Sequence, residues 1–555
     1  MQVKNYQTLF GASFIISLLF SCGGGTSSPT VTKEPAPAPA PINVSPKATA
    51  GADIRINENS SVSILGTASD SDGTISSFLW EQSSGPTIGN LTNTNTAELN
   101  FLAPEVNVET VISFTLTVTD DDGAVASDSV TITVIDTNVQ SIFSNEYSFS
   151  ALKGDGAVVT WGNPSLGGDS SLVQSDLTDI QDIISSSTAF AALKADGSVV
   201  TWGDQNQGGD SSLVQDDLKN VQQVIATRSA FAALKSDGTV VTWGTPTFGG
   251  DSSAVLPELT DVEQVVSNEY SFSALKHDGS VVTWGNPICG GDSSAVQSEL
   301  TNVKQIIPAN NRSFAALKHD GSVVAWGSEL GSNVIVSCSS SSTLKSIVLP
   351  EGLIDIQKIY SNFYSFAALK SDGSVITFGT ADAGGDSSLV QSELTAVQHI
   401  FTTASAFAAL KEDGSVVTWG SLGGDSSLVQ SELSNVKHIF ANGSAFAALK
   451  ENGSVITWGY DYFGGDSSAV QSNLTNVEKI FSNFHSFAAL RTDGSVITWG
   501  SPSWGGDSSG VQENLTNVKQ IYSNSFAYAA LKNNGSVVTW GAAAYGGDSS
   551  GIFFD

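Results

Sequence analysis

Residues 231–244 read FAALKSDGTVVTWG and carry the signals of one β-hairpin. Asp237 and Gly238 stand between two apolar runs of strand-forming residues, and Asp-Gly in that position is the preferred signal of a two-residue hairpin turn. A type I′ turn, with positive φ at both central residues, is therefore predicted at Asp237-Gly238. Residues 231–234 and 240–243 are expected to pair as antiparallel strands.

A third strand is expected before this hairpin, in the segment around Val224. Apolar residues fall on both faces of the hairpin, so both faces must be buried away from water. Identical units packed face to face would bury them. The paired alanines permit close approach, Trp243 is expected to fill the space between neighbouring units, and Gly244 lets the chain leave sharply.

The same pattern recurs from Ser141 to the C-terminus at a usual spacing of about 41 residues. Its marker is an aromatic residue followed by glycine, at Trp161, Trp202, Trp243, Trp284, Trp326, Phe378, Trp419, Trp458, Trp499 and Trp540. Residues 141–555 are therefore predicted to form ten β-rich units. The stretch after each unit, such as 172–180, has apolar residues at helical spacing and is interpreted as a short turn or loop that crosses to the next unit.

The combination of Phe-Ala-Ala-Leu-Lys, Asp-Gly-Ser-Val-Val and Thr-Trp-Gly resembles the repeat of the regulator-of-chromosome-condensation propellers. The short period resembles the secreted bacterial propellers of this type that inhibit β-lactamases. The resemblance covers 141–555 and implies one blade per repeat, with a binding surface made from loops at one end of a ring. The fold class expected is all-β: an immunoglobulin-like β-sandwich followed by a β-propeller-type array of ten repeats.

This chain departs from that family in two respects. Gly-Gly-Asp-Ser-Ser stands where the family commonly has Gly-Gln-Leu-Gly, and ten units are present where seven usually close the ring. One large ring, two smaller rings and an open array all remain open. No segment corresponds to the exchange wedge of the eukaryotic members, so their nucleotide-exchange activity is not carried over, and β-lactamase inhibition stands only as an analogy.

Residues 47–136 read as short strands separated by turn signals, at 61–65, 75–82, 98–102, 111–119 and 129–135. The runs 69–75 and 116–123, with Trp80 between them, resemble the polycystic-kidney-disease (PKD) domain, which implies an immunoglobulin-like sandwich acting as a spacer or weak adhesive unit. Its acidic loops suggest calcium as the one cofactor to consider, and plain Asp-Gly turns are the alternative. The candidate ligands are Asp70, Asp72, Asp120 and Asp122.

The N-terminus reads as an export signal over 1–21, because Lys4 precedes an apolar run too short to span a bilayer. Residues 19–23, LFSCG, resemble the lipobox of bacterial lipoproteins, which implies a lipid anchor on Cys22. The Pro-, Ala- and Ser-rich residues 22–46 are predicted to form a semi-rigid linker. The location expected is the bacterial cell envelope, at the outer membrane, with membrane contact through the lipid anchor alone.

Composition and charge exclude some partners. The formal net charge is −32, and no Lys/Arg cluster is visible along the chain, so nucleic-acid binding is not expected.

A catalytic residue should occur in only one of the repeats, yet almost every polar residue here recurs from repeat to repeat. The basic residue after each Phe-Ala-Ala-Leu is interpreted as a solvated strand end, and the five His residues as surface substitutions without metal spacing. An acidic series follows each Gly-Gly and either satisfies backbone donors in a turn or forms a ring of weak cation or ligand sites. Its members are Asp169, Asp210, Asp251, Asp292, Asp386, Asp425, Asp466, Asp507 and Asp548.

The fifth unit is irregular, because residues 329–352 replace Gly-Gly-Asp-Ser-Ser with a longer Ser-rich loop. This loop contains Cys338, and Cys289 occupies the matching loop of the fourth unit. Adjacent units would bring the two loops together in an oxidising compartment, so a Cys289–Cys338 disulfide is predicted, with two free thiols as the alternative.

The function expected is that of a non-catalytic binding scaffold for an unidentified protein or glycan, and no enzyme activity is expected. The alternative is an inhibitor or modulator of an extracytoplasmic enzyme that acts through the loop 329–352. A purely structural spacer is a third possibility.

Overall fold

The structure is a computed structural model that describes residues 42–106, 108–309, 312–327, 349–552 and 554. The predicted signal peptide, Cys22 and most of the linker lie outside the described residues. Among the described residues, no helix has the length and apolar character needed to cross a bilayer.

The first module is a sandwich of short sheets. A four-stranded sheet has the order β2-β8-β7-β5, and the remaining strands pair as β1-β4 and β3-β6. The strands are β1 (Lys47–Thr49), β2 (Ile54–Asn57), β3 (Ser61–Leu65), β4 (Thr67–Ser69), β5 (Ile75–Ser84), β6 (Glu98–Leu102), β7 (Thr110–Asp120) and β8 (Val125–Ile135). Phe114, Leu116 and Val118 alternate along β7, are fully buried and pack with Trp80 in the core, as their spacing predicts.

All five strands predicted for this module are present, but three others were missed. The missed strands β1, β2 and β4 are only three or four residues long, too short to show an alternating pattern. Strand β8 begins at Val125 rather than Ser129, because it pairs with β7 along its whole length. The repeat array begins with a strand at Val139, two residues before the predicted boundary.

Residues 139–541 contain ten three-stranded antiparallel sheets, each with the second strand of its unit in the middle. The first five are β9 (Val139–Ser144), β10 (Ser148–Lys153), β11 (Val158–Gly162); β12 (Ile180–Ser185), β13 (Ala189–Lys194), β14 (Val199–Gly203); β15 (Val221–Ala226), β16 (Ala230–Lys235), β17 (Val240–Gly244); β18 (Val262–Ser267), β19 (Ser271–Lys276), β20 (Val281–Gly285); and β21 (Val303–Ala309), β22 (Ser313–Lys318), β23 (Val323–Gly327). The last five are β24 (Ile356–Ser361), β25 (Ser365–Lys370), β26 (Val375–Gly379); β27 (Val397–Thr402), β28 (Ala406–Lys411), β29 (Val416–Gly420); β30 (Val436–Ala441), β31 (Ala445–Lys450), β32 (Val455–Gly459); β33 (Val477–Ser482), β34 (Ser486–Arg491), β35 (Val496–Gly500); and β36 (Val518–Ser523), β37 (Ala527–Lys532), β38 (Val537–Gly541).

The connections contain single turns of 3₁₀ helix. One set follows the third strand: η1 (Pro164–Leu166), η3 (Gln205–Gln207), η4 (Pro246–Phe248), η6 (Pro287–Cys289), η8 (Ala381–Ala383), η10 (Asp461–Phe463), η12 (Pro502–Trp504) and η14 (Ala543–Tyr545). The other set lies on the crossing to the next unit, where a short turn was predicted: η2 (Gln174–Asp176), η5 (Leu256–Glu258), η7 (Gln297–Glu299), η9 (Gln430–Glu432), η11 (Gln471–Asn473) and η13 (Gln512–Asn514).

The hairpin of each unit forms as predicted, but the predicted turn type is wrong. In the third unit Leu234 pairs with Val240, and the backbone N–H of Lys235 donates to the carbonyl of Thr239. Three residues therefore separate the last bonded pair, and only Gly238 has positive φ, at 75°. This is the three-residue loop in which a type I turn precedes one left-handed residue, rather than a type I′ turn. The Asp237 carboxylate accepts a hydrogen bond from the backbone N–H of Thr239 at 3.0 Å.

Neighbouring units are joined by an aromatic pair, as the sequence predicts. Phe231 and Trp243 stack with ring centroids 5.2 Å apart, and both belong to a core shared with the alanines of the preceding unit. The indole N–H of Trp243 donates to the carbonyl of Gly208, in the preceding unit, at 3.1 Å. Gly244 has φ of 102°, and a Cβ there would lie 2.8 Å from the Ala230 Cα, which explains the glycine after each aromatic residue.

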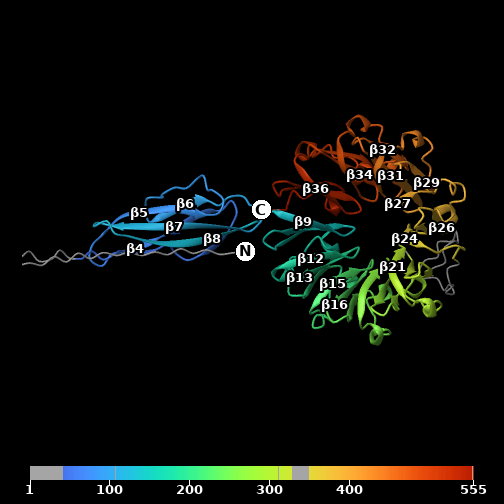
Figure 1. Cartoon of the computed structure of the whole chain (residues 1–555), viewed down its shortest axis with the longest axis horizontal. Helices are drawn as coiled ribbons and strands as arrows, with labels where there is room; N and C mark the ends of the chain where they lie inside the picture. Colours follow the sequence, from blue (N-terminus) through green and yellow to red (C-terminus); the bar gives the residue numbers. More distant parts are fainter. Residues whose placement is uncertain (1–41, 107, 310–311, 328–348, 553, 555) are drawn as a thin grey trace, which may run out of the picture.

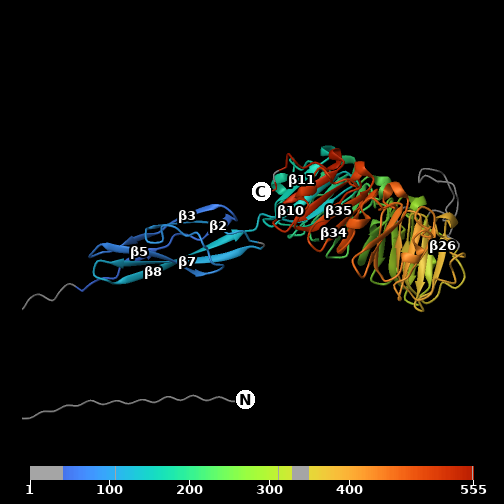
Figure 2. The same ribbon diagram turned by 90° about the horizontal axis from the view of Figure 1, so that it is seen from above.

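The two ends of the repeat array meet (Figure 1). The indole N–H of Trp161, in the first unit, donates to the carbonyl of Gly546, in the tenth, at 3.2 Å. Strands β9 and β10 share a buried core with Ala527, Ala529 and Leu531 of β37. In Figure 1 the first strands β9, β12, β21, β24, β27 and β36 face the middle of this arrangement, and Figure 2 shows the sandwich module beside it.

Candidate functional site

The Gly-Gly-Asp-Ser-Ser loops are a candidate ligand surface, but most of their residues are engaged in packing and hydrogen bonds within the array. The first glycine of each loop lies against the aromatic pair of the next unit: a Cβ on Gly208 would lie 2.5 Å from Cδ2 of Phe231. The first serine is buried in a polar chain. In the eighth unit the Ser467 hydroxyl lies 2.9 Å from that of Thr457 and donates to Gln471, whose amide donates to a carbonyl of β32.

The nine aspartates of these loops act as turn residues. Each carboxylate accepts a hydrogen bond from the backbone N–H two residues later, at 2.8–2.9 Å. This backbone bond is the main cause that lowers the pKa of eight of them, from Asp169 to Asp548. The described residues contain no group of three or more His, Cys, Asp or Glu placed to hold a metal ion. Of the two interpretations, the geometry favours the turn.

The acidic loops of the first module also bond backbone groups. Asp120 accepts hydrogen bonds from the N–H groups of Asp122 and Ala124, and Asp72 accepts one from Val44. Both carboxylate oxygens of Asp70 are buried and find no hydrogen-bond partner in the part of the chain that the structure describes. Calcium at Asp70, Asp72, Asp120 and Asp122 stays a prediction.

Other sequence predictions need correction or remain open. The basic strand ends are not simply solvated: Lys153 is buried, and Lys194, Lys318 and Lys450 donate to carbonyls of the crossing segments. Cys289 is buried and disulfide-bonded. Its predicted partner Cys338 lies outside the described residues, as does most of the loop 329–352. The Cys289–Cys338 pairing and the functional role of this loop therefore both stay predictions.

Aromatic rings from the loops of neighbouring units gather on one surface, which the sequence analysis missed. We call it the aromatic surface; it comes from the loops of the eighth, ninth, tenth and first units. Its members are Tyr460, Phe463, Phe484, His485, Trp504, Phe526, Tyr545 and Tyr147. Tyr460 contacts Phe463 of its own unit, and each of the other rings contacts a ring of a neighbouring unit, so the surface is continuous.

Ring distances define this surface. Phe463 lies 4.8 Å from His485, His485 lies 3.8 Å from Trp504, and Trp504 lies 5.5 Å from Phe526. Tyr147 and Tyr545, from the two ends of the array, lie 5.4 Å apart. Tyr460 is 51% exposed and Phe484 is 41% exposed, so the outer members are available to a partner.

His485 is buried inside this surface, not at the solvent boundary where it was predicted. It is 9% exposed, and its Nδ1 has no hydrogen-bond partner among the described residues. Burial lowers its pKa from 6.5 to about 4, because the surrounding rings cannot solvate the imidazolium. His485 is therefore neutral at pH 7.

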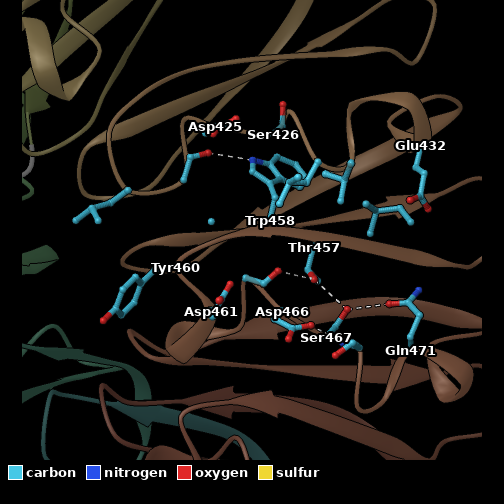
Figure 3. A pocket seen from close by; sticks show the side chains of 18 residues that line it. Asp425, Ser426, Glu432, Thr457, Trp458, Tyr460, Asp461, Asp466, Ser467 and Gln471 are labelled. Atoms are coloured by element: carbon cyan, nitrogen blue, oxygen red, sulfur yellow. Dashed lines mark hydrogen bonds between the residues drawn. The ribbon is translucent and has the colours of Figure 1, made fainter.

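A groove between the seventh and eighth units shares Tyr460 with the aromatic surface (Figure 3). It has a volume of about 730 Å³ and is lined by Trp458, Leu428 and Tyr460, with Asp425 and Asp461 among its carboxylates. Leu428 is 97% exposed. A related groove of about 860 Å³ lies between the first and second units. The grooves therefore follow from the repeat. A single ring pair at positions equivalent to Tyr545 and Tyr147 also stacks between the third and fourth units, Phe248 on Tyr270 at 5.2 Å, whereas the aromatic surface links rings across four consecutive units.

The lowered pKa of His485 predicts that the free energy of unfolding depends on pH. Between pH 6.5 and 4 the unfolded chain binds a proton that the folded chain does not, so stability falls as the pH falls through that window. We expect a loss of about 1–3 kcal/mol between pH 7 and 4.5, and His485→Phe, which keeps a ring in place, should remove it. Urea unfolding of both proteins at the two pH values checks this. Equal losses in the two proteins would contradict it, because every other titratable group is common to both proteins, including His438, whose pKa burial also lowers.

Comparison with known proteins assigns the first module to a class of domains. Residues 50–134 match a family model of PKD domains. The solved PKD domain from the KIAA 1837 protein is 31% identical over 17% of this chain and 89% of its own, with a TM-score of 0.15. Residues 50–134 therefore form a PKD-like domain with an immunoglobulin-like fold.

Two further solved structures share less sequence identity with the chain. A nucleoside hydrolase-related protein from Saccharophagus degradans is 20% identical over 17% of this chain, with a TM-score of 0.15, and the chain spans only 26% of its length. The ectodomain of the Physcomitrella patens receptor kinase CR4 is 14% identical over 49% of this chain and 70% of its own, with a TM-score of 0.27. No curated protein matches the chain.

Proposed function

We propose that this protein is a lipoprotein of the bacterial cell envelope that binds a protein or glycan partner without catalysis. Lipid on Cys22 anchors it at the outer membrane, and the linker and PKD-like domain hold the repeats away from the lipid surface. The ten sheets form a closed propeller of the regulator-of-chromosome-condensation type. The bonds between the first and tenth units and the recurring Trp-Gly packing support this fold.

The aromatic surface is the observation that carries the binding proposal. Exposed Tyr, Trp and Phe side chains offer large apolar area at low conformational cost, and such residues dominate binding energy at interfaces. Most loops of the array serve packing, but the loops of the eighth, ninth, tenth and first units also place their aromatic rings together. A packing role alone does not require Tyr460 to be half exposed.

Capture with the detergent-solubilised full chain tests the proposal. Envelope extract is passed over the immobilised protein, and retained proteins and sugars are quantified by mass spectrometry. The variant Tyr460→Ala/Phe484→Ala/Trp504→Ala should retain at least tenfold less of the partner. The control variant Leu172→Ala/Leu213→Ala/Leu389→Ala removes side chains that are 93–99% exposed elsewhere and should retain it fully.

Two results would overturn the binding proposal: no partner retained by the parent chain, or equal retention by the two variants. Deleting residues 329–352 separates the alternative function, because an inhibitor that acts through that loop would lose all activity, whereas binding through the aromatic surface would persist.

A further inference from the structure

Five lysines that are scattered in the sequence come together on the inner strands of the array. The first strand of each unit lies against the first strand of the next, from β9 round to β36, and these strands face the middle of the arrangement (Figure 1). In the fifth to tenth units they carry Lys304, Lys358, Lys437, Lys479 and Lys519, together with His399 and His438. We call this set of side chains the inner wall.

Local backbone geometry exposes these residues. Each first strand has the pattern apolar-x-x-apolar, and a bulge shifts its register beside the two middle positions, as between Val477 and Lys479. The apolar residues Val477 and Ile480 are buried, and the two between them are exposed. The same burial pattern holds in β24, β27 and β30, so the basic side chains project from two adjacent repeated positions. Lys304, Lys437 and Lys519 stand at the first of them, and Lys358 and Lys479 at the second.

Aromatic rings interleave with the cations. The position after the second apolar residue is Tyr360, Phe401, Phe440, Phe481 and Tyr522 in the sixth to tenth units, whereas it is aliphatic in the second to fifth. The ammonium groups of Lys358 and Lys479 each lie 4.8 Å from the centre of an aromatic ring on their own strand.

Contacts also run between units. The Tyr360 hydroxyl lies 3.4 Å from Nδ1 of His399, and the Phe401 ring lies 4.8 Å from the His438 ring. Cations and rings therefore form one continuous row across at least three inner strands.

The charge of the inner wall opposes that of the molecule. The chain has 23 Lys and Arg against 55 Asp and Glu, yet at the two exposed positions of these six strands Glu478 is the only carboxylate beside five lysines. The corresponding positions in the second to fourth units carry Asp182 and Glu263 and no basic residue. An anionic ligand would thus be attracted to one side of the interior and repelled from the other. The sequence analysis found no basic cluster because these lysines lie about 40 residues apart.

We propose that the inner wall binds an acidic oligosaccharide, with lysines pairing to its carboxylates and aromatic rings stacking on the apolar faces of its sugar rings. A row of alternating cations and rings fits a chain in which every sugar offers both a charge and a ring face. All five charges are ammonium groups, and the planar guanidinium fork that suits phosphate is missing from these positions. Single-stranded nucleic acid, which also pairs basic residues with aromatic stacking, is the competing ligand. This site is separate from the aromatic surface and goes beyond the proposed function.

Calorimetry with the detergent-solubilised full chain tests the inner wall. The probes are hexagalacturonate, its neutral methyl ester and a hexathymidylate, each at low and physiological salt. Only hexagalacturonate should bind, and its affinity should fall as salt rises, because the ion pairs are exposed.

Three variants test whether binding depends on the lysines of the inner wall. Lys358→Gln/Lys437→Gln/Lys479→Gln should weaken binding at least tenfold, and arginine at the same positions should keep it. Lys276→Gln/Lys370→Gln/Lys411→Gln makes the same charge change at strand ends and should alter the affinity less than twofold. Absence of hexagalacturonate binding, equal loss in both glutamine variants, or tighter binding of hexathymidylate would overturn the proposal. The aromatic-surface variant should bind hexagalacturonate normally, so the two proposals fail independently.

Discussion

Trp161→Ala is expected to lower the free energy of unfolding by about 3–5 kcal/mol, the usual cost of removing a buried tryptophan. The side chain is 2% exposed, stacks on Phe149 at 5.2 Å and donates to the carbonyl of Gly546 in the tenth unit. The bond to Gly546 and the burial of the ring depend on contact between the two ends of the array. Chemical denaturation of the parent and variant measures the change.

Trp243→Ala is the matched control, because Trp243 makes the same stack and the same bond at an internal junction. If the ends meet, the two variants should lose similar stability. If the array is open, Trp161 has no preceding unit to bond, and its replacement would cost far less than that of Trp243.

Gly208→Ala should cost about 2–6 kcal/mol, although it adds only one methyl group. Gly208 has φ of 102°, where a side chain is strained by about 1–3 kcal/mol. Its Cβ would also lie 2.5 Å from Phe231, and such overpacking costs about 1–3 kcal/mol more. Thermal and urea unfolding measure the loss.

Gly510→Ala is the control, because a Cβ there meets no atom within 4 Å. It should leave stability nearly unchanged. A neutral effect at Gly208 would show that the Gly-Gly-Asp-Ser-Ser loop is not fixed by packing and would reopen a ligand role for the motif.

The sequence predicts the strands of this fold well where neighbouring residues in the chain specify them. Phe231 to Gly244 specify both strands of a hairpin through composition and one Asp-Gly, and the strand β16 pairs with β17 as expected. The turn type was wrong because it depends on which residues form the last bonded pair, and the same Asp-Gly fits a two- or three-residue loop.

The candidate sites were not predictable in the same way. Tyr147 and Tyr545 lie at opposite ends of the array, and they touch only because its ends meet, a point that the repeat count leaves open. His485 is buried by Trp504 and Phe526, which belong to other loops. The signal that could have found the aromatic surface is the loop positions whose residue changes from unit to unit, such as those of His485 and Trp504.

Hydrogen exchange of the terminal sheets tests the central claim, a closed circuit of ten sheets, most directly. Solenoid arrays fray at their ends, whereas a closed ring has no ends. Closure predicts that the sheets β9–β11 and β36–β38 exchange their strand amides as slowly as the internal sheet β15–β17. Exchange at the two terminal sheets that is faster by orders of magnitude, with the internal sheet still protected, would contradict it.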